Sequence, residues 1–369
     1  MRESADFLAG GWCRGVRSLS RESLKILVTA TLDQWGVDRL SQYGEVANEG
    51  FGDKKRLLAG RKLVRALEGV DVFITEVDQV RARVLEEVEG LRVIACCRAD
   101  PVNVDVATAT ERGIPVLHAP GRNAQAVAEL TLALMLMSLR HIPQAMDILR
   151  QKGGPQGMIK MAVTFFDLKG NELWGKVVGI VGLGAVGSEV AKRLRGFDVE
   201  LLVYDPYVPD AAVEDLGARR VDLVTLLAEA DVVTLHAPLS AETKGMLGRE
   251  EFRLMKPTAR LVNTARAELT DEESLYEALK EGRIAGAALD VFVQEPPPPD
   301  YPLLQLPNVI ATPHIGGNTY EIPVHQSRIV VSDLERLFCG ERPLHIVNPS
   351  ALEGFRWRDQ AEEPNPGDG

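Results

Sequence analysis

The sequence predicts an α/β protein of two domains, each built on a doubly wound parallel sheet. Two observations carry this prediction. The chain has 369 residues, of which 45% are hydrophobic, so it is too long for one ordinary core and has enough apolar surface for two. Short β-branched runs also alternate with helical patterns along most of its length, and this alternation is typical of parallel sheets.

The first series of strands lies between residues 25 and 118. Its runs are KILVTA, VDVFIT, RVIACC and IPVLHA. The turn signal APGRN follows at 119–123. A long helical pattern comes next and is interrupted only by Pro143. We expect this helical segment to mark a domain border. Cys96 and Cys97 are adjacent on a predicted strand, so their side chains point to opposite faces and cannot share a metal. We expect buried thiols in a reducing cytoplasm.

The second series of strands lies between residues 176 and 314. Its runs are KVVGIVG, VELLVYD, DVVTLHAPL, ARLVNTA, IAGAALDV and NVIATPH. A helical pattern at 325–338 is expected to return the chain to the first domain, which would then be discontinuous and separated from the second by a cleft. Residues 1–22 contain no continuous apolar segment of the kind found in a secretory signal. We expect disorder there and in the tail at 349–369, which is rich in Glu, Pro, Gly and Asp.

Composition disfavours two classes of partner. The formal net charge of -11 repels a phosphate backbone, so nucleic acid is not expected. The longest apolar run, at 130–139, is about half the length that a bilayer crossing needs and is followed by Arg140. We therefore expect no membrane span. No pair of cysteines has the spacing of a zinc site, and no metal is expected.

A glycine-rich turn predicts a dinucleotide site. Gly182, Gly184 and Gly187 lie between a strand and an amphipathic helix, and the next strand ends in Asp205. This is the complete setting of the motif: strand, turn, helix, and an acid about 20 residues further on. The glycines would allow the tight turn, the approach of a pyrophosphate and close helix packing, respectively. Asp205 would accept hydrogen bonds from ribose hydroxyls and repel a 2′-phosphate, which favours NAD over NADP.

Three polar residues follow predicted strands of the second domain. Arg266 follows LVNTA, Glu295 comes shortly after AALDV, and His314 lies in TPHIGG after VIAT. Ligands of open α/β sheets bind outside the carboxyl ends of the strands, so these residues can converge beside the cofactor. A histidine alone in such a turn is more often structural.

The chain resembles the D-isomer-specific 2-hydroxyacid dehydrogenases over residues 24–347. The segments that carry the resemblance are ATERGIPVLHAPGRNA, the GLGAVG turn, VVTLHAPL, VNTARAELTDEESLYEAL, DVFVQEP and LPNVIATPHIGG. The resemblance implies a Rossmann NAD-binding domain over 122–314. It also implies a discontinuous, flavodoxin-like substrate domain over 23–121 and 315–348.

The resemblance also implies roles for individual residues. Arg266 would hold the carboxylate and the 2-oxo group of the substrate, His314 would be the acid and base, and Glu295 would be its partner. A substrate loop at 96–105 would add contacts from Arg98, Ala99 and Asp100. The implied cofactor contacts, besides the three glycines, are Ala185, Val186, Asp205, Ala237, Thr264, Ala265, Arg266, Asp290, His314, Gly316 and Gly317.

The resemblance leaves the substrate and one other function open. The loop at 96–105 is shorter than in the family, and AEL follows Arg266 where two glycines are common. The leading interpretation is an NAD-dependent oxidoreductase acting on a small 2-hydroxy acid, with a phosphoglycerate- or glycerate-like molecule as one option. The alternative is a corepressor-like NAD-binding dimer with little turnover. A formate dehydrogenase is disfavoured because that branch has glutamine in place of Glu295. A homodimer is expected through the apolar helix at 123–139.

Overall fold

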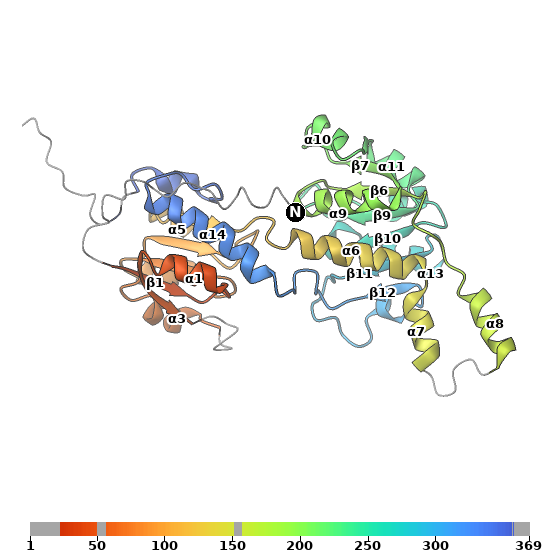
Figure 1. The fold of residues 1–369 in the computed structure, drawn as a ribbon, viewed down its shortest axis with the longest axis horizontal. Helices are drawn as coiled ribbons and strands as arrows, with labels where there is room; N and C mark the ends of the chain where they lie inside the picture. Colours follow the sequence, from red (N-terminus) through yellow and green to blue (C-terminus); the bar gives the residue numbers. More distant parts are fainter. Residues whose placement is uncertain (1–22, 50–56, 151–156, 356, 358–369) are drawn as a thin grey trace, which may run out of the picture. The chain divides into compact units, whose positions relative to one another are not determined.

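The chain folds into two compact units, each with its own parallel sheet. The computed structural model describes residues 23–49, 57–150, 157–355 and 357. The first unit consists of Met1–Arg122 with Tyr320–Gly369, and the second of Asn123–Thr319. Figure 1 shows the strands and helices of both units, and the two parallel sheets confirm the predicted fold class. The expected extension at 1–22 lies outside the described residues.

The first unit contains a five-stranded parallel sheet in the order β2-β1-β3-β4-β5. Its strands are β1 (Leu24–Val28), β2 (Gly44–Asn48), β3 (Val72–Thr75), β4 (Val93–Cys96) and β5 (Val116–His118). One face packs against α1 (Gln34–Leu40) and α14 (Ile322–Phe338), and the other against α3 (Gly60–Ala66), α4 (Ala82–Glu87) and α5 (Val106–Glu111). This is the flavodoxin-like strand order.

The second unit contains a seven-stranded parallel sheet in the order β12-β11-β10-β9-β6-β7-β8. Its strands are β6 (Val177–Val181), β7 (Glu200–Tyr204), β8 (Arg219–Arg220), β9 (Val232–Leu235), β10 (Arg260–Asn263), β11 (Gly286–Leu289) and β12 (Val309–Ala311). One face packs against α6 (Ala124–Leu139), α9 (Ala185–Leu194) and α10 (Asp210–Glu214), and the other against α11 (Leu223–Glu229), α12 (Arg249–Leu254) and α13 (Glu272–Lys280). The order reverses between β6 and β9, and such a switch point is where α/β sheets bind nucleotides.

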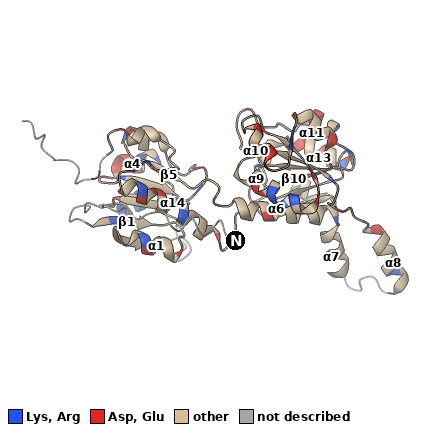
Figure 2. Ribbon diagram, turned by 45° about the horizontal axis from the view of Figure 1, so that its top comes forward, with Lys and Arg blue, Asp and Glu red and all other residues tan. Residues whose placement is uncertain are grey.

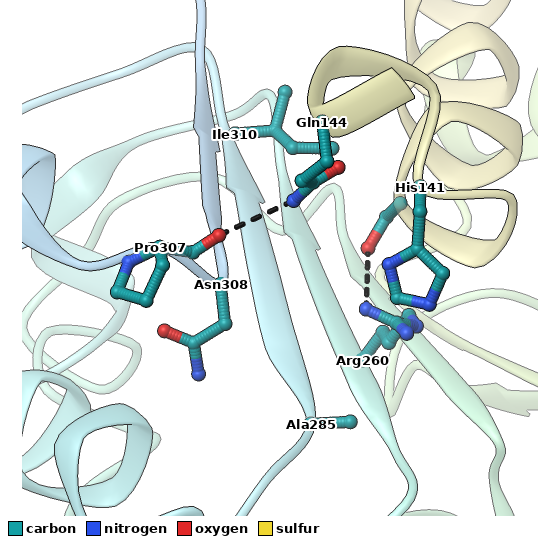
Figure 3. A pocket seen from close by; sticks show the side chains of 8 residues that line it. His141, Gln144, Arg260, Ala285, Pro307, Asn308 and Ile310 are labelled. Carbon is teal, nitrogen blue, oxygen red and sulfur yellow. Dashed lines mark hydrogen bonds between the residues drawn. The ribbon is translucent and has the colours of Figure 1, made fainter. Parts of the chain in front are cut away.

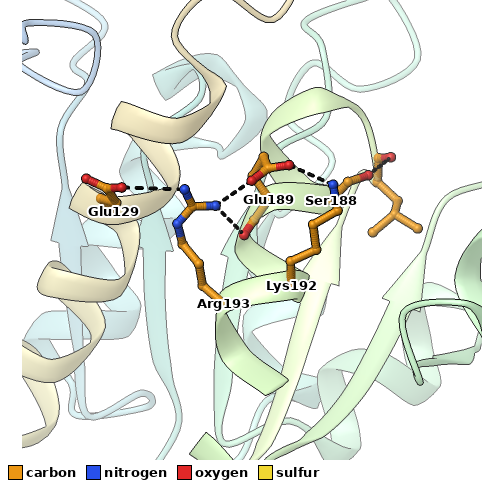
Figure 4. A network of polar contacts seen from close by, with 6 residues as sticks. Glu129, Ser188, Glu189, Lys192 and Arg193 are labelled. Atoms are coloured by element: carbon orange, nitrogen blue, oxygen red, sulfur yellow. Dashed lines mark hydrogen bonds and ion pairs between the residues drawn. The ribbon is translucent and has the colours of Figure 1, made fainter. Parts of the chain in front are cut away.

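Helices α6 and α9 pack together beside this switch point. Their contact is apolar inside and charged at its edge, where Arg193 bridges Glu129 of α6 and Glu189 of α9, as Figure 4 shows. The nitrogen-to-oxygen distances are 3.4 Å to Glu129 and 2.5 Å to Glu189, and Lys192 lies 2.7 Å from Glu189. Ion pairs at the surface contribute about 0 to 1 kcal/mol each, so apolar burial holds α9 in place.

The helical pattern after residue 123 forms two helices instead of one. Helix α6 ends at Leu139, and α7 (Ile142–Arg150) follows at an angle of 68°. Pro143 lies in the first turn of α7, where its missing N–H costs no hydrogen bond. Proline therefore begins a second helix here and does not interrupt the first. No single helix of the described segments is long and apolar enough to cross a membrane, and α6 and α7 meet those criteria only as this bent pair.

The expected dimer contact along 123–139 has little free apolar surface. Ala128, Leu134, Met135 and Leu139 are buried in the core of the second unit, and the other leucines of α6 pack partly against the same cluster. The apolar run is accounted for by one unit because α6 lies between α9 and the strands β10 and β11. An interface through α6 stays a prediction.

In the first unit, one further prediction is confirmed and another is wrong. Cys96 and Cys97 lie in the clusters on opposite faces of the sheet, as their adjacency predicts, and burial raises the pKa of Cys96 to about 12. The expected disordered tail begins too early. A 3-10 helix spans Pro349–Leu352, and the Trp357 ring is buried against Phe338 with its Nε1–H donating to the Leu337 carbonyl. An aromatic side chain thus extends the core into a polar segment.

Candidate active site

The three glycines after β6 differ in what surrounds them. Gly182 has a φ of +91°, and a Cβ atom there would lie 2.5 Å from the Ala237 nitrogen. A Cβ atom on Gly187 would lie 2.1 Å from the Gly182 carbonyl oxygen. Only glycine fits at these two positions. A Cβ atom on Gly184 would meet nothing within 4 Å, so this glycine leaves open space at the start of α9.

The amino end of α9 is suited to a negatively charged group. Its N-cap is Gly184, and no side chain caps the helix. The backbone N–H groups of Ala185 and Val186 belong to the first turn, where the helix dipole attracts anions. Ser188 donates its hydroxyl to the Leu183 carbonyl at 3.0 Å and so holds the turn from behind. These features fit the pyrophosphate of a dinucleotide.

Asp205, directly after β7, is held by backbone donors. One carboxylate oxygen accepts the N–H of Leu183 at 2.8 Å, and the other accepts those of Tyr207 at 2.9 Å and Val208 at 3.2 Å. Sequence reasoning missed Arg220, which donates to the backbone carbonyls of Asp205 and Val208. The residue is distant in sequence, and only the pairing of β8 with β7 brings it here. Its bonds stabilise the turn that presents Asp205.

Arg266 follows β10, and its side chain is exposed. The preceding turn is clamped by Asn263, a buried residue that the sequence analysis did not single out. Its amide accepts the Ala265 N–H at 3.0 Å and donates to the Arg266 carbonyl at 2.8 Å. Among the described residues, the guanidinium makes one hydrogen bond, which it donates to the carbonyl of the preceding residue, Ala265, at 2.7 Å. It is therefore available to an anion.

His314 and Glu295 form a hydrogen-bonded pair, as predicted from the sequence. The distance from His314 Nδ1 to Glu295 Oε2 is 2.8 Å, and Glu295 Oε1 accepts the Phe292 N–H at 3.1 Å. Burial alone would raise the pKa of the Glu295 carboxyl, but the hydrogen bonds from His314 and Phe292 and the charges of His314 and Arg266 bring that pKa below its usual value. Glu295 is thus a carboxylate at neutral pH, and Nε2 is the nitrogen of His314 left for a substrate.

Asp290 organises the turn that carries His314. This residue, 1% exposed, accepts the Thr312 hydroxyl at 2.6 Å, the Ile315 N–H at 2.9 Å and the Gly316 N–H at 2.8 Å. His314 between them has a φ of +54°, a left-handed conformation that is rare for histidine. Sequence analysis assigned Asp290 only to the cofactor. Its role in this turn could not be read from the sequence, because the partners lie more than twenty residues away.

The remaining predicted cofactor residues line the carboxyl ends of the same strands. Ala237 packs behind Gly182 after β9. Thr264, after β10, is buried, and its hydroxyl lies 2.9 Å from that of Thr131 on α6. Gly317 lies against Asn123, where a Cβ atom would be 3.2 Å from the amide nitrogen. Their contact with a cofactor stays a prediction. No group of three or more His, Cys, Asp or Glu side chains could hold a metal within the segments that the structure describes.

The predicted substrate residues Arg98, Ala99 and Asp100 belong to the first unit. They follow β4, and His118 and Ala119 hold their backbone. The His118 Nδ1 atom lies 2.7 Å from the Ala99 carbonyl oxygen, and the Ala119 N–H donates to the Arg98 carbonyl at 2.8 Å. Ala99 and Asp100 are exposed. A role in substrate binding stays a prediction.

Comparison with known proteins shows which family this chain is similar to. Residues 132–316 match the profile of the D-isomer specific 2-hydroxyacid dehydrogenases, NAD binding domain. A 2-hydroxyacid dehydrogenase of Bacillus subtilis (strain 168), YoaD, is 40% identical over 90% of this chain and 96% of its own length. The glyoxylate reductase of Korarchaeum cryptofilum is 36% identical over 89% and 97%. The D-3-phosphoglycerate dehydrogenase of Methanocaldococcus jannaschii is 40% identical over 88% of this chain, which spans 59% of that longer protein.

Solved structures agree with these relatives. A protein from Thermus thermophilus is 36% identical and superimposes with a TM-score of 0.70, over 88% of this chain and all of its own. The D-lactate dehydrogenase of Escherichia coli is 29% identical with a TM-score of 0.69, again over 88% of this chain and all of that one. The similarity thus extends across both units.

Proposed function

The chain belongs to the D-isomer specific 2-hydroxyacid dehydrogenases, NAD-dependent oxidoreductases, and we propose that Arg266, Glu295 and His314 are its catalytic residues. The enzyme interconverts a D-2-hydroxy acid and its 2-oxo acid by hydride transfer. The observation that carries the catalytic assignment is the 2.8 Å hydrogen bond between His314 and Glu295, in the same unit as the open glycine turn and the available Arg266.

Each catalytic residue has a distinct task. In reduction, the nicotinamide supplies the hydride, and the substrate oxygen needs a proton as it becomes an alkoxide. His314 donates that proton from Nε2, while Glu295 stabilises the imidazolium through Nδ1. Arg266 pairs its planar fork with the substrate carboxylate, in a geometry that lysine cannot reproduce. In oxidation, the neutral ring of His314 removes the proton from the hydroxyl.

The cofactor site is proposed from the same unit. The first turn of α9, beside Gly184, would hold the pyrophosphate of NAD, and Asp205 would accept hydrogen bonds from the adenosine ribose. A 2′-phosphate there would lie against a carboxylate that three backbone N–H groups already hold in place. Arg220 is not expected to favour NADP, because its guanidinium is paired with the Asp210 carboxylate and also donates to the backbone carbonyls of Asp205 and Val208.

The proposed substrate is a short 2-oxo acid. Relatives that match this chain over nearly their whole length include a glyoxylate reductase, whereas the match to the phosphoglycerate dehydrogenase covers 59% of that protein. The corepressor-like alternative is not favoured, because these relatives carry the names of dehydrogenases and reductases. We propose that Arg98, Ala99 and Asp100 contact the substrate. The variant Arg98→Ala is then expected to raise KM more than it lowers kcat.

A panel of 2-oxo acids tests the proposed function. Purified protein is mixed with NADH and with glyoxylate, pyruvate, hydroxypyruvate or 3-phosphohydroxypyruvate, and the NADH absorbance is followed. We expect turnover with glyoxylate or hydroxypyruvate to exceed that with the phosphorylated acid, and His314→Ala to abolish it. Binding of NADH without turnover of any acid would refute the catalytic assignment. Faster turnover of the phosphorylated acid would refute the substrate class alone.

We further propose a homodimer that forms through α8 (Met158–Asp167). This helix and α7 extend from the second unit in Figure 1 and are mostly uncharged in Figure 2. Its large apolar side chains are exposed, with Met158 at 89%, Ile159 at 82%, Phe165 at 76% and Phe166 at 71%. A contiguous exposed apolar patch marks an interaction surface. A cytoplasmic location is also proposed, because the reaction depends on NAD.

A further inference from the structure

A pocket lies at the amino ends of β10, β11 and β12, at the opposite end of these strands from Arg266, Asp290 and His314. It has a volume of about 160 Å³. Figure 3 shows its lining, which includes His141 and Gln144 from the α6–α7 region and Arg260 from β10. The volume is several times what one water molecule requires, so a small molecule fits. None of the proposed catalytic roles involves these residues.

The Arg260 side chain is the main charge in this pocket. The residue is 8% exposed, and its Nη1 atom donates to the Ser138 hydroxyl at 3.2 Å. Its Nε atom is buried without a hydrogen-bond partner, and no carboxylate pairs with the guanidinium in the segments that the structure describes. Burial lowers the pKa of Arg260, but a guanidinium stays protonated in proteins. A buried cation without a counter-charge is costly, so the pocket favours an anion.

Two further groups narrow the choice of ligand. Gln144 donates its Nε2–H to the Pro307 carbonyl at 3.2 Å, which fixes the orientation of the amide. Its Oε1 atom is buried and accepts nothing from the described residues. Burial and the charge of Arg260 lower the pKa of His141, so that ring is neutral at pH 7. The pocket thus offers a cation, a neutral ring and one unused acceptor.

We propose that this pocket binds a small hydroxy acid. The carboxylate would accept hydrogen bonds from Arg260 Nε and the Ser138 hydroxyl, which already accepts from Arg260 and can donate its own proton. The hydroxyl of the ligand would donate to Gln144 Oε1. An amino acid fits less well, because its ammonium would lie near the Arg260 guanidinium and the residues that line the pocket include no carboxylate to pair with that ammonium. The site is separate from catalysis, although its ligand has the same chemistry as the substrate.

Calorimetric titration with glycolate and acetate tests this proposal, because the two acids differ by one hydroxyl. The titrations use full-length Arg266→Leu protein, which lacks the cation of the catalytic site. We expect glycolate to bind, and acetate to bind about fivefold more weakly for want of one hydrogen bond. Adding the substitution Arg260→Leu to the Arg266→Leu protein should weaken the binding of both acids at least about tenfold. Arg140→Leu, which removes an exposed neighbouring charge, is the matched control and should change neither.

Gln144→Leu provides a second test that leaves the buried strand intact. It should bring the affinity for glycolate down to that for acetate while acetate is unchanged. This variant decides the question if Arg260→Leu does not fold, as judged by circular dichroism. Absence of glycolate binding to the Arg266→Leu protein would overturn the proposal. Equal binding with and without Arg260, or a preference for glycolate that survives Gln144→Leu, would do the same.

Discussion

His314 is held in one orientation by two carboxylates. Asp290 binds the backbone on the carboxyl side of the histidine, and Glu295 binds its ring. A φ of +54° is unfavourable for a side chain with a Cβ atom, and such residues persist only where their surroundings enforce them. The two carboxylates supply that enforcement. Because Nδ1 is bound to Glu295, Nε2 is the nitrogen available for the proposed proton transfer.

The pairing of Glu295 with His314 predicts a pH effect. Because the pKa of Glu295 is below its usual value, the residue is ionised through the working pH range and stabilises the imidazolium. Glu295→Gln removes this charge. Reduction, which needs the protonated ring, should then fall at a lower pH, and oxidation should likewise rise at a lower pH, because the carboxylate no longer stabilises the protonated ring. The measurement is kcat/KM against pH in both directions.

The Glu295→Gln profiles need a control for general loss of activity. Glu268→Gln changes a half-buried carboxylate on the 3-10 helix that follows Arg266. This variant should leave the fall in reduction and the rise in oxidation at the same pH as in the wild type. If the pH profiles of Glu295→Gln coincide with those of the wild type, Glu295 is not the partner of His314. The fold and the cofactor would be unaffected by that result.

Asp290 gives a second prediction at the residue scale. In Asp290→Asn the amide cannot accept every donor that the carboxylate accepts, so a buried N–H in the turn loses its partner. The free energy of unfolding should fall by about 1 to 3 kcal/mol, and kcat should fall as the His314 turn loosens. Urea unfolding and steady-state kinetics measure the two effects. Asp300→Asn, at an exposed position, should change neither; a normal kcat in Asp290→Asn would show that the turn is held by other contacts.

At the scale of elements, we propose that the turn after β7, which Arg220 of β8 supports, selects the cofactor. Asp205→Ala removes the acceptor for ribose hydroxyls and the carboxylate that repels a phosphate, so the affinity for NADH should fall roughly tenfold while that for NADPH changes little or rises. Fluorescence titration with both dinucleotides measures the ratio. Asp215→Ala, exposed beside α10, is the control. A wild-type protein that binds NADPH as tightly as NADH would contradict the role of Asp205.

Most elements could be predicted, because buried parallel strands have continuous apolar runs. The two missed strands lack this signal. In β2 the residues Glu45, Ala47 and Asn48 are exposed at the edge of the sheet, and β8 has only two residues, both arginines. Residues of the candidate site could be proposed from the sequence where they follow strands directly, as Arg266 and His314 do.

The supporting residues of the site were not predictable from sequence. Asn263 was hidden because its partners are backbone groups of its own turn. Arg220 and Asp290 act on segments that only the sheet brings near them. Long-range contacts of this kind follow from the assembled sheet and not from local sequence patterns.

At the scale of the whole molecule, the two units divide the proposed tasks. The proposed catalytic and cofactor residues all lie in the second unit, and the proposed substrate contacts Arg98, Ala99 and Asp100 lie in the first. The unit that carries the proposed catalytic residues also carries the exposed apolar surface of α8. The proposed dimer contact and the proposed catalytic residues therefore lie in one folded unit.

The exposed face of α8 predicts the state of the molecule in solution. We expect a dimer at micromolar concentration, because four large apolar side chains of one helix are too exposed for a monomer to leave uncovered. Replacing Phe165 and Phe166 together with Asp puts two charges into that contact and should give monomers in sedimentation velocity. Tyr320→Asp, at a residue 98% exposed in the first unit, is the control and should stay dimeric. Either a monomeric wild-type protein or a dimeric double variant would mean that α8 is not the contact between subunits.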